Sequence, residues 1–511
     1  KPTWLENHRR CWALLYRLTL PPAPMATSAP TTDITPADAA PPALATAEPT
    51  VEASCVVSER PVGRNSVWTT AGIIVADVVG AGILGMPVAV AKFGWLLGSL
   101  VLTAMLAMNV HISVVLWRVR MAYPSARTLG ELATATFAEA PAWQRRLIGA
   151  LTEGPQMLMI FSILGLYLLS AAQGLGMIFY DLRICLPQWA MFAGMLILPF
   201  AGTAREMGAF QWLIWLNIIT LTGTVLIPLV YMAIAGTEEI RPEGSVVEPI
   251  APVKVAGVLS ALSTFTFGMT SQVVLVEIID EMEDPSQLPK AYTMISAPFQ
   301  WIAFMVAGIG GYYFIGSKAA GMIDQNIPFG IAFRVAAMCL AAHMLVSYFI
   351  KSVVFCRAVQ AYIDPKSAKD TTGRRAWASW SGITFAVVVV AYIVANVVPF
   401  FNDAVDLIGA SLAPLICCIL PIAFFVRMRV DAPEKIHIAF HERAVLFVEI
   451  AMACVLMVFG TISTLMHIIE QWDTFGYPFE CHCEGVWSTC ACSADHIGMA
   501  DECGALPLPL A

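Results

Sequence analysis

The sequence predicts an all-α protein that crosses a membrane many times. Of its 511 residues, 58% are hydrophobic and only 13% are charged, and the mean hydropathy is +0.71. Ordinary soluble domains have about 25% charged residues. The apolar residues also fall into long runs, each able to cross about 30 Å of hydrocarbon as a helix.

Eleven apolar runs make up the predicted membrane domain, residues 66–468. Each is read as one membrane-spanning helix, and the fourth is short for that purpose. The runs cover residues 67–92, 94–117, 147–177, 189–203, 210–235, 255–279, 292–315, 330–359, 377–399, 404–426 and 444–468.

The positive charges predict how these runs are oriented. Most of the 29 Lys and Arg residues fall on the side of the membrane that holds the N-terminus. Because cytoplasmic loops are enriched in Lys and Arg, we expect a cytoplasmic N-terminus and, after an odd number of spans, a non-cytoplasmic C-terminus. The exceptions are Lys92, Arg183, Arg241, Lys254, Lys318 and Arg334.

Two tails flank the predicted membrane domain. Residues 1–65 are rich in Ala, Pro and Thr and are expected to form a disordered cytoplasmic tail. Residues 1–24 precede the first methionine. We expect that they are a fragment or a translated leader rather than functional sequence. Residues 469–511 are expected to form a cysteine-rich tail on the non-cytoplasmic side.

The C-terminal tail carries two C-x-C pairs. On the non-cytoplasmic side, disulfides are the simpler account of these cysteines, and Cys185 is expected on the same side as a further partner. Zinc or copper binding is the alternative, since thiolates suit both metals. The weak candidate metal ligands are Cys481, Cys483, Cys490 and Cys492.

Several function classes lack their sequence motifs. The chain has no G-x-x-x-x-G-K-[ST] loop for ATP, no filter sequence such as TVGYG and no H-E-x-x-H zinc motif. Basic and aromatic residues do not cluster as a nucleic-acid surface requires. We therefore expect no enzyme activity, no cofactor and no nucleic-acid partner, and a lipid bilayer as the surroundings.

The first run contains residues that interrupt a helix. In VADVVGAGILGMPVAVAKFG, Gly80, Gly82 and Gly85 lie close together, Pro87 follows, and Asp77 precedes them by about one turn. A single glycine in such a helix is usually a packing device. A carboxylate at mid-membrane costs about 2.5–3.5 kcal/mol, however, so the combination favours a broken helix beside protein or a watery cavity.

The sixth run has a matching interruption. In LSALSTFTFGMTSQVVLVEIIDEMEDPSQLPKA, Gly268 lies mid-run among hydroxyl-bearing residues, and Glu277 follows before the cytoplasmic charges. Two interrupted helices five runs apart are typical of transporters built as a five-plus-five inverted repeat, in which substrate binds between the breaks near the bilayer midplane. Because five is odd, the second repeat must begin on the opposite side, as the charge distribution also requires.

Four segments resemble the amino acid/auxin permeases, a family within the amino acid–polyamine–organocation superfamily. VGAGILGMPVAVAKFGW and FTFGMTSQVVLVEIIDEMEDPSQLPKA are similar to the first and sixth helices of that family. YPSARTLGELATATF resembles the segment before the third helix, and VVPFFNDAVDLIGASLAPLICCILPIAFF resembles the tenth helix. The resemblance implies a leucine-transporter-type fold and secondary active transport of amino acids, driven by protons or, in some branches, by sodium.

The resemblance also implies which groups bind the substrate. Phe267, beside Gly268, is expected to be a wall or gate of the site or, equally, a packing residue. Main-chain amides are expected to bind the substrate carboxylate, helped by the positive end of the second half-helix; they lie around Gly80, Ala81, Gly82 and Ile83. Carbonyls freed by the breaks are expected to bind the ammonium group; they lie near Ala76, Val79, Thr264 and Phe267.

Asp77 is the expected proton-coupling group, because a desolvated carboxylate can load and release a proton near neutral pH. The alternative is a structural partner for a hydroxyl or amide of a neighbouring helix. In the sodium-coupled branch an Asn stands near Ala76, and a hydroxyl near Ser347 completes the ion site. Ser347 is present but Ala76 has no side-chain oxygen, so protons are expected rather than sodium.

The other ionisable residues of the runs receive plainer interpretations. Glu277 is expected to be a gating residue in a salt bridge, or a solvated charge. Lys351 is expected to be an interface charge. His111 and His343 are expected to be hydrogen-bonded packing residues.

A sensor that binds an amino acid at the same site and signals without net flux is the alternative function. Such a protein would need an extended, structured cytoplasmic segment, and the N-terminal tail is only moderate in length, which favours transport. The sequence leaves open which amino acid is bound, and whether the protein resides in the plasma membrane or in a vacuolar or endosomal membrane.

Overall fold

The computed structural model describes residues 65–180, 182, 184–203, 205, 211–319, 321–369, 373–397, 401–431, 439–470 and 479. Apart from a few residues at their inner ends, the two predicted tails lie outside this part of the chain, so their disorder and cysteine pairing stay predictions. The described residues are helical, with β structure limited to one isolated bridge between Asn65 and Met282.

Nine helical segments of the described chain are long and apolar enough to cross a membrane. Several are built from consecutive α, 3-10 and π helices that continue one another. The segments are α4 (Trp95–Ala122); α6 (Ala142–Ile178); α8 (Gln211–Ala235); α10 (Val255–Gly268) with α11 (Gln272–Asp280); η4 (Lys290–Ser296) with α12 (Ala297–Met305), η5 (Val306–Gly310), α13 (Gly311–Ile315) and η6 (Gly316–Lys318); α14 (Ile331–Ile363); α16 (Arg374–Val397); α17 (Phe401–Ala413) with η8 (Pro414–Ile419) and α18 (Leu420–Asp431); and α19 (Phe440–Val455) with η9 (Leu456–Gly460) and α20 (Thr461–Glu470).

The first and fourth predicted runs form shorter helices. The first is divided into α2 (Val67–Val78), η1 (Ala81–Ile83) and α3 (Met86–Ala91), because its glycines and proline interrupt the helical hydrogen bonds. The fourth is α7 (Leu186–Ala201), which begins a few residues before the predicted run. Length alone therefore identifies fewer spanning helices than the apolar runs predict.

Short helices occupy several of the connections. They are α5 (Leu129–Thr136), α9 (Thr237–Ile240), η3 (Pro285–Gln287), η7 (Ile323–Asn326) and α15 (Pro365–Lys369). The hydroxyl of Thr128 accepts a hydrogen bond from the Glu131 N–H and so caps α5 at its N-terminus. The main-chain N–H of Ile323 donates to the Leu84 carbonyl at 3.1 Å, which holds η7 against the end of η1.

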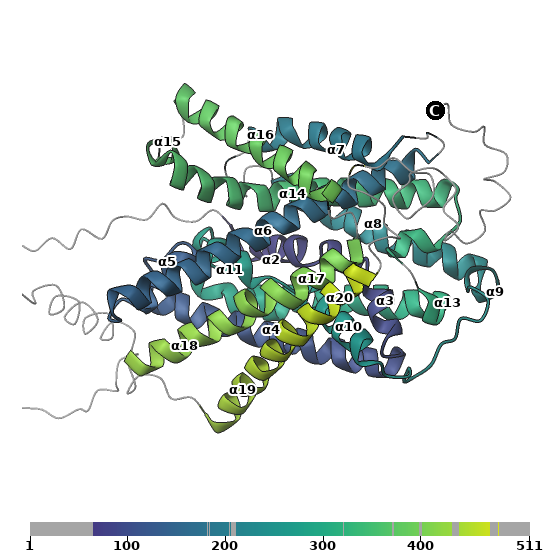
Figure 1. Cartoon of the computed structure of the whole chain (residues 1–511), viewed down its shortest axis with the longest axis horizontal. Coiled ribbons are helices and arrows are strands. Elements are labelled where there is room, and N and C mark those ends of the chain that lie inside the picture. The colour runs from purple at the N-terminus through teal and green to yellow at the C-terminus, as the bar shows by residue number, and fades with distance from the viewer. Residues whose placement is uncertain are drawn as a thin grey trace, which may run out of the picture. The chain divides into compact units, whose positions relative to one another are not determined.

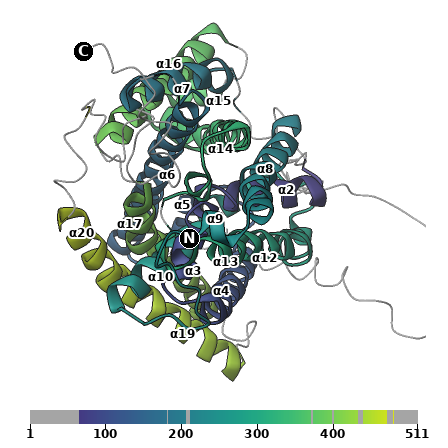
Figure 2. The same ribbon diagram turned by 90° about the vertical axis from the view of Figure 1, so that its right-hand side faces the viewer.

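The long helices α6 and α14 run side by side, and α10 runs beside α17 (Figure 1). Small residues permit the close approach of α6 and α14: a Cβ on Gly174 would lie 3.2 Å from the Ala341 Cβ. α7 packs against α6 and α16, away from the helices that carry the breaks (Figure 2).

Polar and apolar side chains are distributed as a bilayer requires. Large apolar residues point outward on several helices, such as Ile219 at 68% and Phe447 at 74% exposure. Charged side chains lie inside, including Asp77, Lys351 and Glu449. A soluble protein would rarely expose so much apolar surface, whereas lipid tails cover it without penalty.

Candidate functional site

The chain leaves regular helical geometry at both predicted interruptions. α2 ends at Val78, and Gly80 takes a conformation that is neither helical nor extended, with φ −98° and ψ −137°, before η1 begins. Pro87 lies in the first turn of α3, where its missing N–H leaves no gap in the hydrogen bonding. In the sixth run, α10 ends at Gly268 and α11 begins at Gln272.

The two breaks touch each other through their glycines. A Cβ on Gly82 would lie 2.3 Å from the Gly268 Cα and 3.3 Å from the Phe267 ring. A Cβ on Gly268 would lie 2.6 Å from the Met86 side chain. Only glycine allows this approach, so the sequence of each break is matched to the other.

The main-chain groups of the first break differ in whether they already have hydrogen-bond partners. The amides of Ala81 and Gly82 begin a helix, where no preceding carbonyl is placed to accept from them. The Ala76 carbonyl accepts from the Asn217 side-chain amide at 3.3 Å. Of the four amides predicted to bind a carboxylate, Gly80 N–H donates to the Val78 carbonyl at 2.8 Å and Ile83 N–H to the Gly80 carbonyl at 3.3 Å. Among the described residues, only the amides of Ala81 and Gly82 are therefore open, while one predicted ammonium ligand already has a donor.

The predicted ligands of the second break are also engaged. The Phe267 carbonyl accepts from the Thr270 N–H at 3.2 Å and from the Thr270 hydroxyl at 2.9 Å. Thr264 lies inside α10, four residues before its end, and its hydroxyl donates to Asp406 Oδ1 at 2.5 Å. Side-chain hydroxyls, as well as main-chain carbonyls, therefore form the hydrogen bonds at this break.

Asp77 has a partner that the sequence did not identify. The Lys351 Nζ lies 2.6 Å from the Asp77 Oδ1, and both side chains are almost completely buried. Lys351 is therefore not an interface charge, and that interpretation was wrong. Its position inside the apolar run 330–359 was the available signal, because an ammonium within the membrane must be paired.

Ser347 and Asn217 complete this site between α2, α8 and α14. The Asn217 Nδ2 lies 3.4 Å from the Ser347 hydroxyl as well as 3.3 Å from the Ala76 carbonyl. Ser347 and Lys351 are one helical turn apart on α14 and therefore share a face. The structure thus places Ser347 and Asp77, both predicted as coupling-ion residues, around one site, and their role in coupling stays a prediction.

Two further residues beside the breaks escaped the sequence analysis. The Tyr167 hydroxyl of α6 lies 2.7 Å from the position of a Cβ on Gly80, so it points at the first break. Asp406 of α17 accepts from Ser260 and Thr264, each at 2.5 Å, and so joins α17 to α10. Tyr167 has no distinguishing sequence signal, but Asp406 is a carboxylate within an apolar run.

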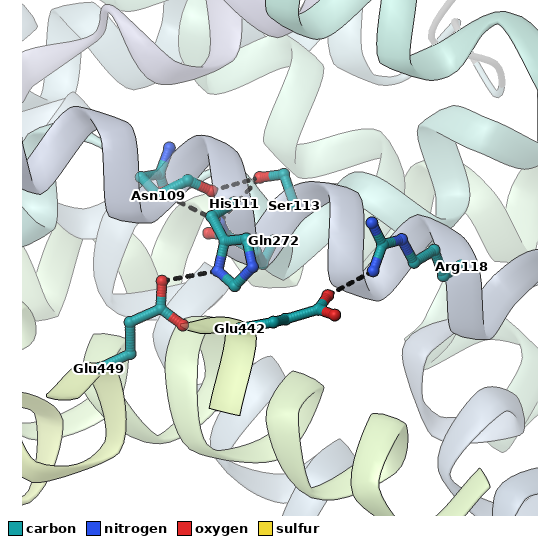
Figure 3. A network of polar contacts seen from close by, with 7 residues as sticks. All are labelled: Asn109, His111, Ser113, Arg118, Gln272, Glu442 and Glu449. Atoms are coloured by element: carbon teal, nitrogen blue, oxygen red, sulfur yellow. Dashed lines mark hydrogen bonds and ion pairs between the residues drawn. The ribbon is translucent and has the colours of Figure 1, made fainter. Parts of the chain in front are cut away.

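A polar network holds the start of α11 against α4 (Figure 3). Gln272 donates to the Asn109 side chain at 2.7 Å and to the Ser113 hydroxyl at 2.9 Å. On another face of α4, His111 lies 2.8 Å from the buried Glu449 of α19. α11 is thus fixed to its neighbour immediately after the second break.

Glu277 lies one turn before the charges at the end of α11. Its Oε1 accepts from the Gln156 side chain at 3.3 Å. The ion pairs at this end of the helix involve other carboxylates: Asp280 with Arg120 at 3.0 Å and Glu281 with Arg357 at 3.3 Å. A gating role for Glu277 stays a prediction, and Gln156 is its partner in this conformation.

Asp324, in η7, lies outside the helices long enough to span the membrane. Its side chain is fully buried, and neither carboxylate oxygen has a hydrogen-bond partner within the described residues. Burial raises the pKa of the Asp324 carboxyl well above its usual range.

We expect Asp324→Asn to stabilise the protein at neutral pH. A carboxyl with a raised folded-state pKa stabilises the fold below its unfolded-state pKa of about 4, and this contribution is lost as pH rises through the folded-state pKa. Because Asn is neutral without taking up a proton, the variant should be more stable by about 1–3 kcal/mol at pH 7. Thermal unfolding in detergent from pH 4 to 8 measures the effect, with the exposed Glu238→Gln as matched control. A variant no more stable than wild type at pH 7 would contradict the expectation.

Among the described residues, no three His, Cys, Asp or Glu side chains are grouped as a metal site. The four cysteines named as weak metal ligands lie outside the described residues. Cys185 is disulfide-bonded.

A family profile described as "Transmembrane amino acid transporter protein" matches residues 63–466. The chain belongs to this family. The match covers both breaks and every helix from α2 to α19, and it confirms the resemblance to the amino acid/auxin permeases. The protein is thus an integral membrane transporter of amino acids and not an enzyme.

Individual relatives of this transporter are distant in sequence. A "Transmembrane transporter" of Fusarium pseudograminearum is 23% identical over 80% of this chain and 85% of its own length. "Amino acid permease 4" of Arabidopsis thaliana is 21% identical over 71% of this chain and 85% of its own length.

A solved structure identifies the fold. The crystal structure of MhsT in complex with L-phenylalanine superposes on 79% of this chain and 99% of its own length, with a TM-score of 0.54 and 13% sequence identity. At that identity the likeness concerns the fold alone. The amino acid transporter therefore has the leucine-transporter-type fold that the resemblance implied.

Proposed function

We propose that this amino acid transporter is a secondary active, proton-coupled carrier that binds its substrate between the two breaks. The single observation that carries the proposal is the contact of Gly82 with Gly268, which brings both interruptions to one place. The carboxylate of the substrate is bound by the amides around Ala81 and Gly82, at the positive end of a helix. Phe267, beside this contact, forms one wall.

The proposed transport cycle is alternating access by a five-plus-five inverted repeat. Eleven spans are obtained when α7 and the divided first helix are added to the nine long segments. The N-terminus is proposed to be cytoplasmic, because most Lys and Arg residues then face the cytoplasm. Glu277 is proposed as a gating residue on that side. Residence in the plasma membrane or in a vacuolar or endosomal membrane is compatible with the proposal.

Coupling is proposed at the site formed by Asp77, Lys351 and Ser347. A buried ion pair is sensitive to an added proton, because protonating the carboxylate leaves an ammonium without its counter-charge. Sodium is less suited to this site: the Ala76 carbonyl already accepts from Asn217, and Lys351 already supplies a positive charge beside Asp77. The proton is therefore the proposed driving ion.

Uptake into proteoliposomes tests the proposal. A panel of labelled amino acids is supplied with an imposed proton gradient, sodium gradient or neither, to wild type and Asp77→Asn. We expect at least one amino acid to accumulate under the proton gradient in wild type, and at least a tenfold loss of this gradient-driven uptake in the variant. Uptake that ignores the proton gradient, or a variant that remains fully gradient-driven, would refute coupling at this site.

The same experiment separates transport from sensing. A sensor would bind amino acid, measured by scintillation proximity on the purified protein, yet give no uptake under any gradient. Binding without flux in vesicles that hold correctly folded protein would therefore replace transport with sensing as the proposed function.

A further inference from the structure

His343 is a fully buried titratable residue on α14 that the coupling site has not yet included. It lies one turn before Ser347 and two turns before Lys351, so it shares their face of the helix. Neither ring nitrogen has a hydrogen bond of ordinary geometry among the described residues. A buried polar group without partners is uncommon and needs an explanation. Here it points to a bound ligand or to a second protonation state of the ring.

Two features of the surroundings act in opposite directions on the protonation of the ring: burial disfavours the charged imidazolium, and nearby main-chain acceptors favour it. The main chains of Val79, at the first break, and of Asn217, on α8, both lie against the imidazole as hydrogen-bond acceptors. A neutral imidazole carries one N–H, whereas the protonated ring carries two. A main-chain acceptor at each ring nitrogen would be satisfied in full only when His343 has bound a proton.

Because the carboxylate of Asp77 is paired with Lys351, His343 is the group of this site that can gain a proton. Asp77 is already neutralised by Lys351 at 2.6 Å. In the described part of the chain, α7 and α8 carry no charged residue, and the charged residues of α15 and α16 lie at the far end of α14. The ionisable groups facing this stretch from the packed elements are Asp77 of α2, Tyr167 of α6, Asp324 of η7, and Cys339 and Lys351 of α14 itself.

We propose that His343 binds the transported proton, and that its positive charge and the carboxylate of the amino acid substrate stabilise each other at the first break. The inference rests on the proposed function and refines it, because it makes His343, rather than the Asp77 carboxylate, the proton-binding residue of that site. Val79 touches the imidazole and stands two residues before Ala81, whose amide is proposed to bind the carboxylate. Asp77 and Lys351 then set the local charge, and His343 carries the proton.

This arrangement predicts a specific linkage. If substrate and proton stabilise each other, acidification must tighten substrate binding, because coupling between two ligands is reciprocal. Binding linked to one proton changes the dissociation constant by up to tenfold per pH unit. A zwitterionic amino acid does not itself titrate near neutral pH, so the dependence would belong to the protein.

The test is the pH dependence of binding to the purified full-length protein. Dissociation constants for L-phenylalanine, L-alanine and L-glutamine are measured from pH 5 to 8 for wild type, His343→Gln and the matched control His111→Gln. We expect wild type and His111→Gln to bind more tightly at low pH, by up to tenfold per unit, and His343→Gln to bind more weakly with a flat profile. A profile for His343→Gln parallel to that of wild type would overturn the inference.

Two further measurements test the inference even if His343→Gln does not fold. If His343→Gln is not monodisperse in detergent, His343→Asn replaces it, and proton uptake on mixing wild type with L-phenylalanine, L-alanine or L-glutamine is followed with a pH indicator. Uptake of up to one proton per bound amino acid supports the inference, and no uptake overturns it. Vesicle uptake driven by a proton gradient in both wild type and His343→Gln would refute His343 as carrier and leave the proposed function standing; no gradient-driven uptake in wild type would refute the proposed function.

Discussion

Lys351→Met is expected to destabilise the transporter by about 3–5 kcal/mol. The variant leaves the Asp77 carboxylate buried without its counter-charge, which in wild type lies 2.6 Å away. Both side chains are almost fully removed from solvent, so water cannot take over the role of the ammonium. Thermal unfolding of the purified protein, followed by tryptophan fluorescence at fixed detergent concentration, measures the loss.

A charge-neutral double variant separates this effect from lost packing. Asp77→Asn with Lys351→Met removes both charges, and replacing a whole buried pair is often close to neutral for stability. We expect the double variant to recover most of the stability lost by Lys351→Met, yet to lose proton-driven uptake. Lys318→Met removes an exposed ammonium and is expected to change stability by about 0.5 kcal/mol or less. A single variant as stable as its Lys318 counterpart would contradict a structural ion pair.

Gly82→Ala is expected to reduce amino acid transport by about 100-fold, because overpacking by one methyl group costs about 1–3 kcal/mol and here the obstacle is backbone. The new Cβ would lie 2.3 Å from the Gly268 Cα, a distance that no side-chain rotation can relieve. The two breaks must then move apart, and the substrate groups of η1 move with them. Initial uptake rates, normalised to protein in the vesicle membrane, measure the effect.

Gly382→Ala is the matched control. Gly382 lies in α16, and an added Cβ there meets nothing within 4 Å. We expect this variant to transport at the wild-type rate, within about twofold, because surface substitutions usually change stability by less than 0.5 kcal/mol. Equal rates for Gly82→Ala and Gly382→Ala would mean that the contact between the breaks has no part in transport.

The helical architecture was largely predictable because its causes are local. Apolar runs must hydrogen-bond internally in a bilayer, so they form helices wherever they occur. The first break was predictable for the same reason: Gly80, Gly82 and Pro87 weaken the helix within their own segment. The fourth run shows the limit of length as a criterion, since α7 has only 16 residues.

The contents of the site were predictable only in part, because they depend on contacts between distant segments. The sequence indicated that Asp77 needs a partner, but Lys351 lies on another helix far along the chain. Nothing local distinguishes Tyr167 from other membrane tyrosines, or His343 from a packing histidine. Their positions beside the first break follow from how α6 and α14 pack against it.

The packing of the helices changes how two predicted ligands are interpreted. Thr264 was assigned through its carbonyl, yet α10 continues to Gly268, and the Thr264 hydroxyl is hydrogen-bonded to Asp406 beside the break. The Ala76 carbonyl was expected to bind an ammonium group, and in the structure it already accepts a hydrogen bond from Asn217. Breaks in a helix identify where main-chain groups are freed, but the neighbouring helices decide which of them stay open.

The measurement that tests the account most directly is concentrative uptake by wild-type protein in vesicles with an alkaline interior. The membrane potential is clamped with potassium and valinomycin, so that the proton gradient alone can drive transport. With proton coupling, we expect a labelled amino acid to accumulate above its external concentration, and a proton ionophore to abolish the accumulation. Uptake that stops at equal concentrations on both sides, with or without the ionophore, would contradict it.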